Sequence, residues 1–154
     1  MPENPDAHAA AASAPCASVP AHGRVFGQPQ TFLALDYGRK RVGGATGNRL
    51  LGGATPLGTV AAVGELRFQQ LKRWIDEWQP DALVIGVPFH PDGASHENTV
   101  AARAFGAELH RRFGKAVYEV DERYTTTEAL SMGAKDADAA AAAIILEQFL
   151  SSWT

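Results

Sequence analysis

The stretch TFLALDYGRKRVGGATG (residues 31–47) joins an apolar run directly to a group of charged residues. Its first part, Phe32–Leu35, is uniformly apolar, which is typical of a buried strand. That run ends on a carboxylate, Asp36, and Gly38 follows two residues later. Three cations then stand in a row: Arg39, Lys40 and Arg41. An acid and a glycine here suit a simple turn, but they also suit a functional acid held rigidly at a strand end.

The composition predicts one globular domain. The chain has 154 residues, of which 45% are hydrophobic and 20% charged, as in ordinary globular domains. The net charge of −3 and the pI of about 5.9 argue, taken alone, against a nucleic-acid-binding protein. The cations nevertheless gather locally, at residues 39–41, 72–73 and 111–115, so a basic face on a mildly acidic protein is compatible with the sequence.

The N-terminal part differs in composition from the rest. Residues 1–30 are rich in Ala and Pro and lack any helix or strand period, which predicts a disordered tail ahead of a domain at 31–154. They have neither the basic start nor the apolar core of a signal peptide. Cys16 is the single cysteine, which excludes a disulfide framework and is consistent with a reducing cytoplasm. No apolar run approaches the ~20 residues of a membrane span, so we expect no membrane association.

The segment after the first strand (31–36) predicts a hairpin. Residues 42–47 and 50–57 are expected to form its two strands, joined by a turn at Gly47 and Asn48. Gly43 and Gly44 weaken the strand assignment and suggest either a bulge or a close approach of another backbone.

Alternating strands and helices follow the hairpin. A helix ending before Pro80 has apolar residues at helical spacing, namely Leu71, Trp74, Ile75 and Trp78, and we expect both tryptophans to lie in the core. Residues 82–88 are apolar throughout, which predicts a strand of a parallel sheet. A helix at 98–113, a strand at 116–123 and a helix at 136–152 complete the pattern. A hairpin feeding alternating β and α units predicts an α/β sandwich with a mixed sheet.

Acidic residues stand where the predicted elements begin or end. Asp36 ends the first strand, Asp121 and Glu122 end the fifth, and Asp138 lies in the first turn of the last helix. Parallel strands end at the same edge of a sheet, where sites form in open α/β folds. Carboxylates without His or Cys suit Mg²⁺ or Mn²⁺, and two such ions ~3.5–4 Å apart can clamp a scissile phosphate.

Each acid also has a structural explanation. Asp36 can belong to a turn, Glu122 can pair on the surface with Arg123, and Asp138 can interact with the helix dipole. Asp-x-Gly after a strand also opens the phosphate loop of actin-like ATPases, but those enzymes need two such domains and this chain holds one. Spacing alone therefore leaves the alternatives open.

Four segments together resemble the YqgF/RuvX family of the ribonuclease H-like superfamily: LALDYGRKRVGGA (33–45), VIGVPFHPDG (84–93), DERYTTTEA (121–129) and DADAAAAAIILEQFL (136–150). Its members are described as pre-16S rRNA nucleases and, earlier, as Holliday junction resolvases. The resemblance implies a ribonuclease H-like three-layer sandwich. Its five-stranded mixed sheet has the order 3-2-1-4-5, with strand 2 antiparallel.

The resemblance also implies a set of site residues. Catalytic carboxylates map to Asp36, Glu122 and Asp138, which are expected to bind Mg²⁺ or Mn²⁺, with two ions in the site. Asp121 is the second choice for the metal ligand of the fifth strand. Nucleic-acid contacts are expected from the residues beside these acids: Arg39, Lys40, Arg41, Arg123, Thr125 and Thr126. One of the threonines can equally be a helix N-cap.

The chain departs from the family pattern at three places. The segment between Thr127 and Asp138 is shorter than in many relatives, Phe89-His90-Pro91 replaces a common Asn-Met pair, and Arg39 replaces a small hydroxyl residue.

The leading hypothesis from the sequence is a cytoplasmic, metal-dependent nuclease. It is expected to process the 5′ end of pre-16S rRNA within ribosomal precursor particles, as a monomer or weak homodimer. One alternative is a dimeric Holliday junction resolvase acting on branched DNA. Another, from a different class, is a non-catalytic RNA-binding factor of ribosome assembly.

Overall fold

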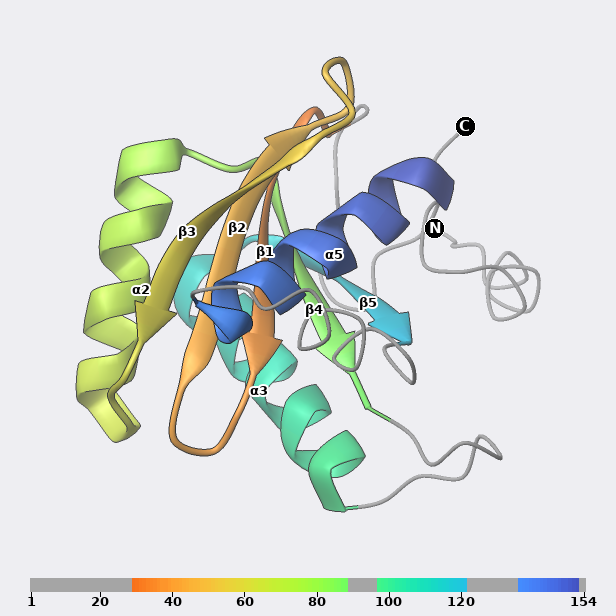
Figure 1. Ribbon diagram of the computed structural model, residues 1–154. Helices are drawn as coiled ribbons and strands as arrows, with labels where there is room; N and C mark the ends of the chain where they lie inside the picture. Colours follow the sequence, from red (N-terminus) through yellow and green to blue (C-terminus); the bar gives the residue numbers. More distant parts are fainter. Residues whose placement is uncertain (1–28, 89–96, 122–135, 153–154) are drawn as a thin grey trace, which may run out of the picture.

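The computed structural model describes residues 29–88, 97–121 and 136–152 (Figure 1). Within these ranges the chain forms five strands and three helices. In chain order they are β1 (Thr31–Tyr37), β2 (Val42–Asn48), β3 (Ala54–Val60), α2 (Gly64–Trp78), β4 (Ala82–Val87), α3 (Glu97–Phe113), β5 (Ala116–Asp121) and α5 (Ala137–Ser152).

The strands form one mixed sheet in the order β3-β2-β1-β4-β5. β2 runs antiparallel to both β1 and β3, whereas β1, β4 and β5 are parallel to one another. Helices α2 and α3 cover one face of the sheet and α5 crosses the other (Figure 1). The predicted three-layer α/β sandwich, its strand order and the antiparallel second strand are therefore confirmed.

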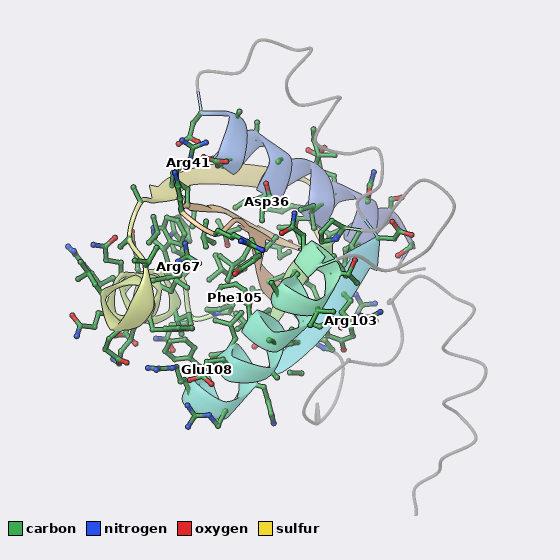
Figure 2. The ribbon with its side chains drawn as sticks, turned by 90° about the horizontal axis from the view of Figure 1, so that it is seen from below. Asp36, Arg41, Arg67, Arg103, Phe105 and Glu108 are labelled. Atoms are coloured by element: carbon green, nitrogen blue, oxygen red, sulfur yellow. The ribbon has the colours of Figure 1, made fainter. Side chains whose placement is uncertain are left out.

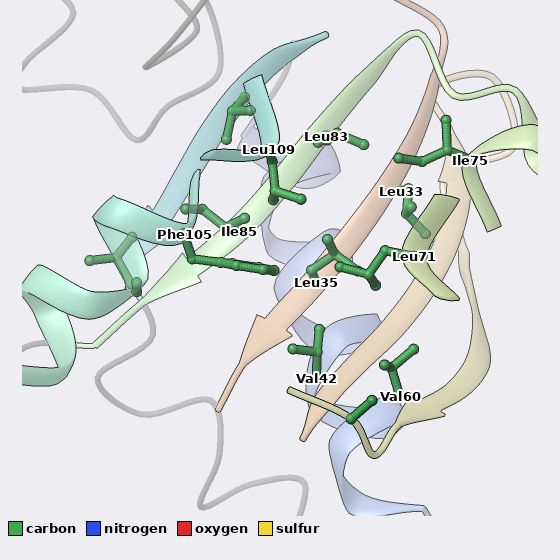
Figure 3. Close-up of a cluster of buried hydrophobic side chains, with 14 residues drawn as sticks. Leu33, Leu35, Val42, Val60, Leu71, Ile75, Leu83, Ile85, Phe105 and Leu109 are labelled. Carbon is green, nitrogen blue, oxygen red and sulfur yellow. The ribbon is translucent and has the colours of Figure 1, made fainter. Parts of the chain in front are cut away.

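The alternation of side chains along β1 divides the core into two layers. Leu33 and Leu35 are fully buried against α2 and α3 (Figure 3). Phe32 and Ala34 are equally buried, but they face α5. Because successive residues of a strand point to opposite faces, Asp36 falls on the face of Ala34, the one that α5 covers.

An aromatic group fixes α5 over the parallel strands. The ring of Phe149 in α5 lies 5.0 Å from that of Phe32 and 5.0 Å from that of Tyr118, measured between centroids. Such pairs contribute about 0.5–1.5 kcal/mol each beyond their buried area. The angle at which α5 crosses the sheet therefore depends on packing far from its first turn.

The β2–β3 hairpin corrects the predicted strand bounds. β3 begins at Ala54 and not at residue 50, because the turn lies at 49–53 and not at Gly47 and Asn48. Asn48 still shapes the turn, since its side-chain oxygen accepts a hydrogen bond from the Leu51 N–H at 2.8 Å. Leu50 and Leu51 resemble strand residues but are 86% and 83% exposed at the tip.

The prediction for the two tryptophans is half right. Trp74 packs against the core, but Trp78, the last residue of α2, is 42% exposed. Helical spacing predicts which face of a helix is apolar but not how far the neighbouring sheet extends beneath it.

The ends of the described chain bear on two further predictions. Of the predicted tail, Pro29 and Gln30 are described: the Pro29 carbonyl accepts a hydrogen bond from Arg49 at 3.4 Å, and the Gln30 N–H donates to the Asp81 carboxylate at 2.8 Å. Residues 1–28 lie outside the described residues. No helix within the described ranges is long and apolar enough to cross a membrane.

Candidate active site

The parallel strands end at one edge of the sheet, and α5 begins there (Figure 1). Asp36 lies at this edge, one residue before the end of β1, and its side chain is partly buried. The buried residues before it hold the backbone in the sheet, so Asp36 has a fixed position.

Gly43 brings the first turn of α5 onto this edge. In the register of β1 and β2, Gly43 lies directly opposite Asp36. A Cβ atom built on Gly43 would lie 1.9 Å from the carbonyl oxygen of Asp138, closer than any real contact allows. The Asp138 backbone therefore touches β2 at the residue paired with Asp36, and both acids lie at the same end of the same face.

Asp136 fixes the start of the helix. Its carboxylate accepts hydrogen bonds from the Ala139 N–H at 3.0 Å and from the Thr59 hydroxyl at 2.6 Å. It thus caps α5 and ties it to β3. Asp138 lies in the first turn without serving as this cap, so its carboxylate is available to other partners.

Arg41 is the described partner of Asp138. Its Nε lies 2.9 Å from Asp138 Oδ2, and the side chains are 63% and 29% exposed. Figure 2 views the molecule from this edge and labels Asp36 and Arg41. Of the three predicted phosphate-binding cations, Arg41 is thus paired with a candidate metal ligand, while Arg39 and Lys40 are exposed on the connection between β1 and β2.

Asp121 falls on the opposite face from Asp36. It pairs in register with Val87 of β4, which belongs to the core layer under α2 and α3. The structure therefore brings Asp36 and Asp138 together but not Asp121. Four other predicted site residues lie outside the described residues: Glu122, Arg123, Thr125 and Thr126.

The carboxylates of Asp36 and Asp138 are chemically suited to bind a hard divalent cation. Carboxylate oxygens are the ligands that Mg²⁺ and Mn²⁺ prefer, and Asp138 already attracts a cationic side chain. Within residues 29–88, 97–121 and 136–152, no group of three or more His, Cys, Asp or Glu side chains could hold a metal. The third proposed acid, Glu122, is not among these residues.

The glycine-rich β2 strand shows both features expected of it. Gly43 is the site of a close backbone approach, and the β2–β3 register shifts between Gly44 and Ala45.

The sequence reasoning missed Arg67, which is buried on α2 with 5% exposure. The sequence could have indicated this burial, because Arg67 precedes Leu71 and Ile75 at helical spacing and so falls on the apolar stripe of the helix.

Comparisons with known proteins agree with this architecture. The model of the RuvX family, described as Holliday junction resolvase, matches residues 30–152. A protein of Albidiferax ferrireducens named "Putative pre-16S rRNA nuclease" is 67% identical over 123 residues, which cover 80% of this chain and 79% of that protein. A Polaromonas protein of the same name is 63% identical, covering 80% of this chain and 89% of its own length.

A distant similarity to solved structures also exists. Thermus thermophilus RuvC, solved with a Holliday junction substrate, aligns with 75% of this chain and 91% of its own. The identity is 16% and the TM-score 0.46, which is too distant to bear on function.

The mixed sheet in the order β3-β2-β1-β4-β5, with β2 antiparallel, is the sheet predicted for a nuclease of the ribonuclease H-like fold class. The chain belongs to the RuvX family. It is accordingly a nuclease, an enzyme whose substrate is nucleic acid and whose chemistry depends in general on divalent metal.

Proposed function

We propose that this nuclease processes the 5′ end of pre-16S rRNA in the cytoplasm, with Asp36, Glu122 and Asp138 holding two Mg²⁺ or Mn²⁺ ions. The observation that carries the site is the contact between Gly43 and the Asp138 backbone, directly opposite Asp36. The names of close relatives support the RNA substrate.

The third carboxylate is proposed to be Glu122. Asp121, the alternative, lies on the face of the sheet that α3 covers, away from Asp36 and α5. Glu122 is the adjacent acid in the sequence, and it matches the family's acid at the end of the fifth strand.

Each residue has a distinct role in the proposed reaction. Asp36 supplies a carboxylate in a fixed position, because β1 is buried on both sides of the sheet. Asp138 supplies a second, whose Oδ2 is held by Arg41 at 2.9 Å. Ions held by these carboxylates would supply activation of a water molecule and stabilisation of the charge on the leaving oxygen.

The exposed cations are proposed to bind the flanking phosphates. Arg39 and Lys40 are exposed on the turn that follows Asp36, and cations beside an active site commonly contact substrate phosphates. Arg123, Thr125 and Thr126 are proposed to add contacts from the segment after β5. These contacts would position the strand and leave base identity unread.

A substrate panel tests this proposal. The protein would be incubated with precursor 16S RNA, mature 16S RNA and four-way junction DNA, each with Mg²⁺, with Mn²⁺ and with EDTA, and all new ends would be mapped. We expect metal-dependent ends at the 5′ side of the precursor only. Cleavage of the junction alone, by a species that light scattering shows to be a dimer, would favour the resolvase alternative. RNA binding without turnover in any metal would favour the non-catalytic alternative.

A further inference from the structure

Arg67 is a buried cation that the proposed reaction does not use. It lies on α2 with 5% exposure, and Figure 2 labels it between that helix and the end of the sheet that carries Asp36. Within the described residues, the other buried polar side chain is Thr99.

The partners of Arg67 are backbone carbonyls and an aromatic ring. Its Nε donates to the carbonyl of Ala62 at 2.8 Å, and its Nη2 donates to the carbonyl of Arg39 at 2.9 Å. The guanidinium also lies 5.6 Å from the centre of the Tyr37 ring. Burial lowers the pKa of the Arg67 guanidinium, while the neighbouring hydroxyl of Tyr37 acts in the opposite direction.

Burial of this charge is not explained by fold stability alone. No carboxylate among the described residues pairs with the guanidinium, and a buried charge without an opposite charge is costly. An apolar side chain in the same stripe as Leu71 and Ile75 would pack without that cost. The buried guanidinium holds two backbone carbonyls, that of Ala62 beside α2 and that of Arg39 in the turn after β1.

That carbonyl lies in the turn between β1 and β2. The turn is narrow, since a Cβ on Gly38 would lie 2.6 Å from the carbonyl oxygen of Arg41. Fixing the Arg39 carbonyl therefore also restricts Arg41, two residues further on. Arg41 in turn holds Oδ2 of Asp138 at 2.9 Å.

We infer that Arg67 is a positioning residue of the active site, which anchors the 38–41 turn so that Arg41 orients the Asp138 carboxylate. The inference rests on the proposed function for its link to catalysis. The anchoring itself is a property of the chain and can be measured without substrate.

The variants needed are Arg67→Lys, Arg67→Met and a control, Arg73→Met. Arg73 is exposed on the same helix, so its replacement removes the same charge without touching the turn. A lysine at 67 keeps the charge but cannot donate to two carbonyls in the fork geometry of arginine. Thermal unfolding of each variant, followed by circular dichroism, would identify a temperature at which all of them are folded.

The decisive measurement is hydrogen exchange at the Arg41 Nε–H, followed by NMR and assigned through an Arg41→Lys variant. We expect exchange to accelerate at least roughly tenfold in Arg67→Met, to accelerate less in Arg67→Lys, and to remain unchanged in Arg73→Met. Unchanged exchange in a folded Arg67→Met protein would overturn the inference.

Metal affinity and turnover then test the link to the site. Loss of an outer partner of a metal ligand typically costs 10–100-fold in affinity or activity, so we expect Mn²⁺ binding and kcat to fall by about tenfold in Arg67→Met, with KM little changed. In an Arg41→Met background the same substitution should have little further effect. Tighter Mn²⁺ binding in Arg67→Met would overturn the inference, because it would mean that Arg41 competes with the metal.

The outcomes separate the inference from the proposed function. A parent protein without divalent-dependent cleavage would refute the proposed function, while the exchange of the Arg41 proton would still decide whether Arg67 anchors the turn. Cleavage by the parent together with full additivity of the Arg41 and Arg67 substitutions would refute the inference alone.

Discussion

Gly43 of β2 and Asp138 of α5 are in direct backbone contact: a Cβ on Gly43 would lie 1.9 Å from the Asp138 carbonyl oxygen. Gly43 is the register partner of Asp36 in the neighbouring strand β1. The contact therefore sets the separation of Asp36 and Asp138, which are about a hundred residues apart in the chain. A single missing side chain thus determines whether the first turn of α5 can reach the end of β1.

Replacing Gly43 by alanine should therefore displace α5. Overpacking of this kind costs about 1–3 kcal/mol, and the displaced helix should also lower nuclease activity more than the loss of stability explains. The measurements are urea unfolding and the initial rate of cleavage at a temperature where the variant is folded.

Gly53→Ala is the matched control for Gly43→Ala. Nothing lies within 4 Å of a Cβ at Gly53, and its φ is not in the left-handed region. We expect a change within about 0.5 kcal/mol and full activity. Equal effects of the two substitutions would show that the contact with Asp138 is not the cause.

Asp36→Asn should abolish metal-dependent cleavage while leaving the fold intact. Loss of an outer partner of a metal ligand costs up to about 100-fold, so loss of a direct ligand should cost at least as much. Cleavage rates in Mg²⁺ and Mn²⁺ check this. Asp76→Asn, which removes an exposed acid of α2 paired with Lys72, should keep full activity. An active Asp36→Asn protein would remove the proposed mechanism.

Lys40→Gln should act differently from Arg41→Gln. In the described part of the chain, Lys40 is exposed and forms no ion pair with Asp36 or Asp138. Its loss should therefore weaken RNA binding and reduce the slope of log K against log salt by about 0.7 for a single-stranded substrate. Turnover at saturating RNA should not change. Arg41→Gln should lower turnover, because Arg41 holds Asp138. Binding titrations at several salt concentrations, combined with single-turnover rates, distinguish the two.

Asp81 should make stability depend on pH below about pH 4. Its carboxylate accepts hydrogen bonds from the Gln30 and Thr31 N–H groups at 2.8 and 3.0 Å. Burial alone would raise the pKa of Asp81, but these bonds outweigh it and the pKa is lowered. The resulting stabilisation is complete above the unfolded-state value of about 3.9 and is lost as the pH falls through the lower folded-state pKa.

The corresponding measurement compares the parent with Asp81→Asn. At pH 7 the parent should be more stable by up to about 1 kcal/mol, a value limited by solvent screening of this exposed group. At a pH below about 4 the difference should be smaller, and it should keep shrinking as the pH falls further. A difference that is the same at both pH values would mean that the charge of Asp81 does not contribute.

Local patterns predicted the elements well but their ends less well. The apolar runs of β1 and β4 and the helical spacing of Leu71 and Ile75 gave the correct elements, because burial imposes these periods on the sequence. The apolar side chains of Leu50 and Leu51 predict strand residues, but both occupy a turn and are exposed. Apolar residues at a hairpin tip carry no periodic signal that distinguishes them from strand residues.

The sequence by itself determined the family, the α/β order of elements and the identity of the candidate acids, because each of these is written in short local segments. Only the tertiary structure decided which acids lie at the same end of the same face of the sheet. The register of β4 and β5 places Asp121 on the face opposite Asp36, and the contact at Gly43 brings Asp138 to the same face as Asp36. It also revealed Arg67 and its hold on the turn. Such relationships depend on strand register and backbone approach between distant segments, which no local pattern encodes.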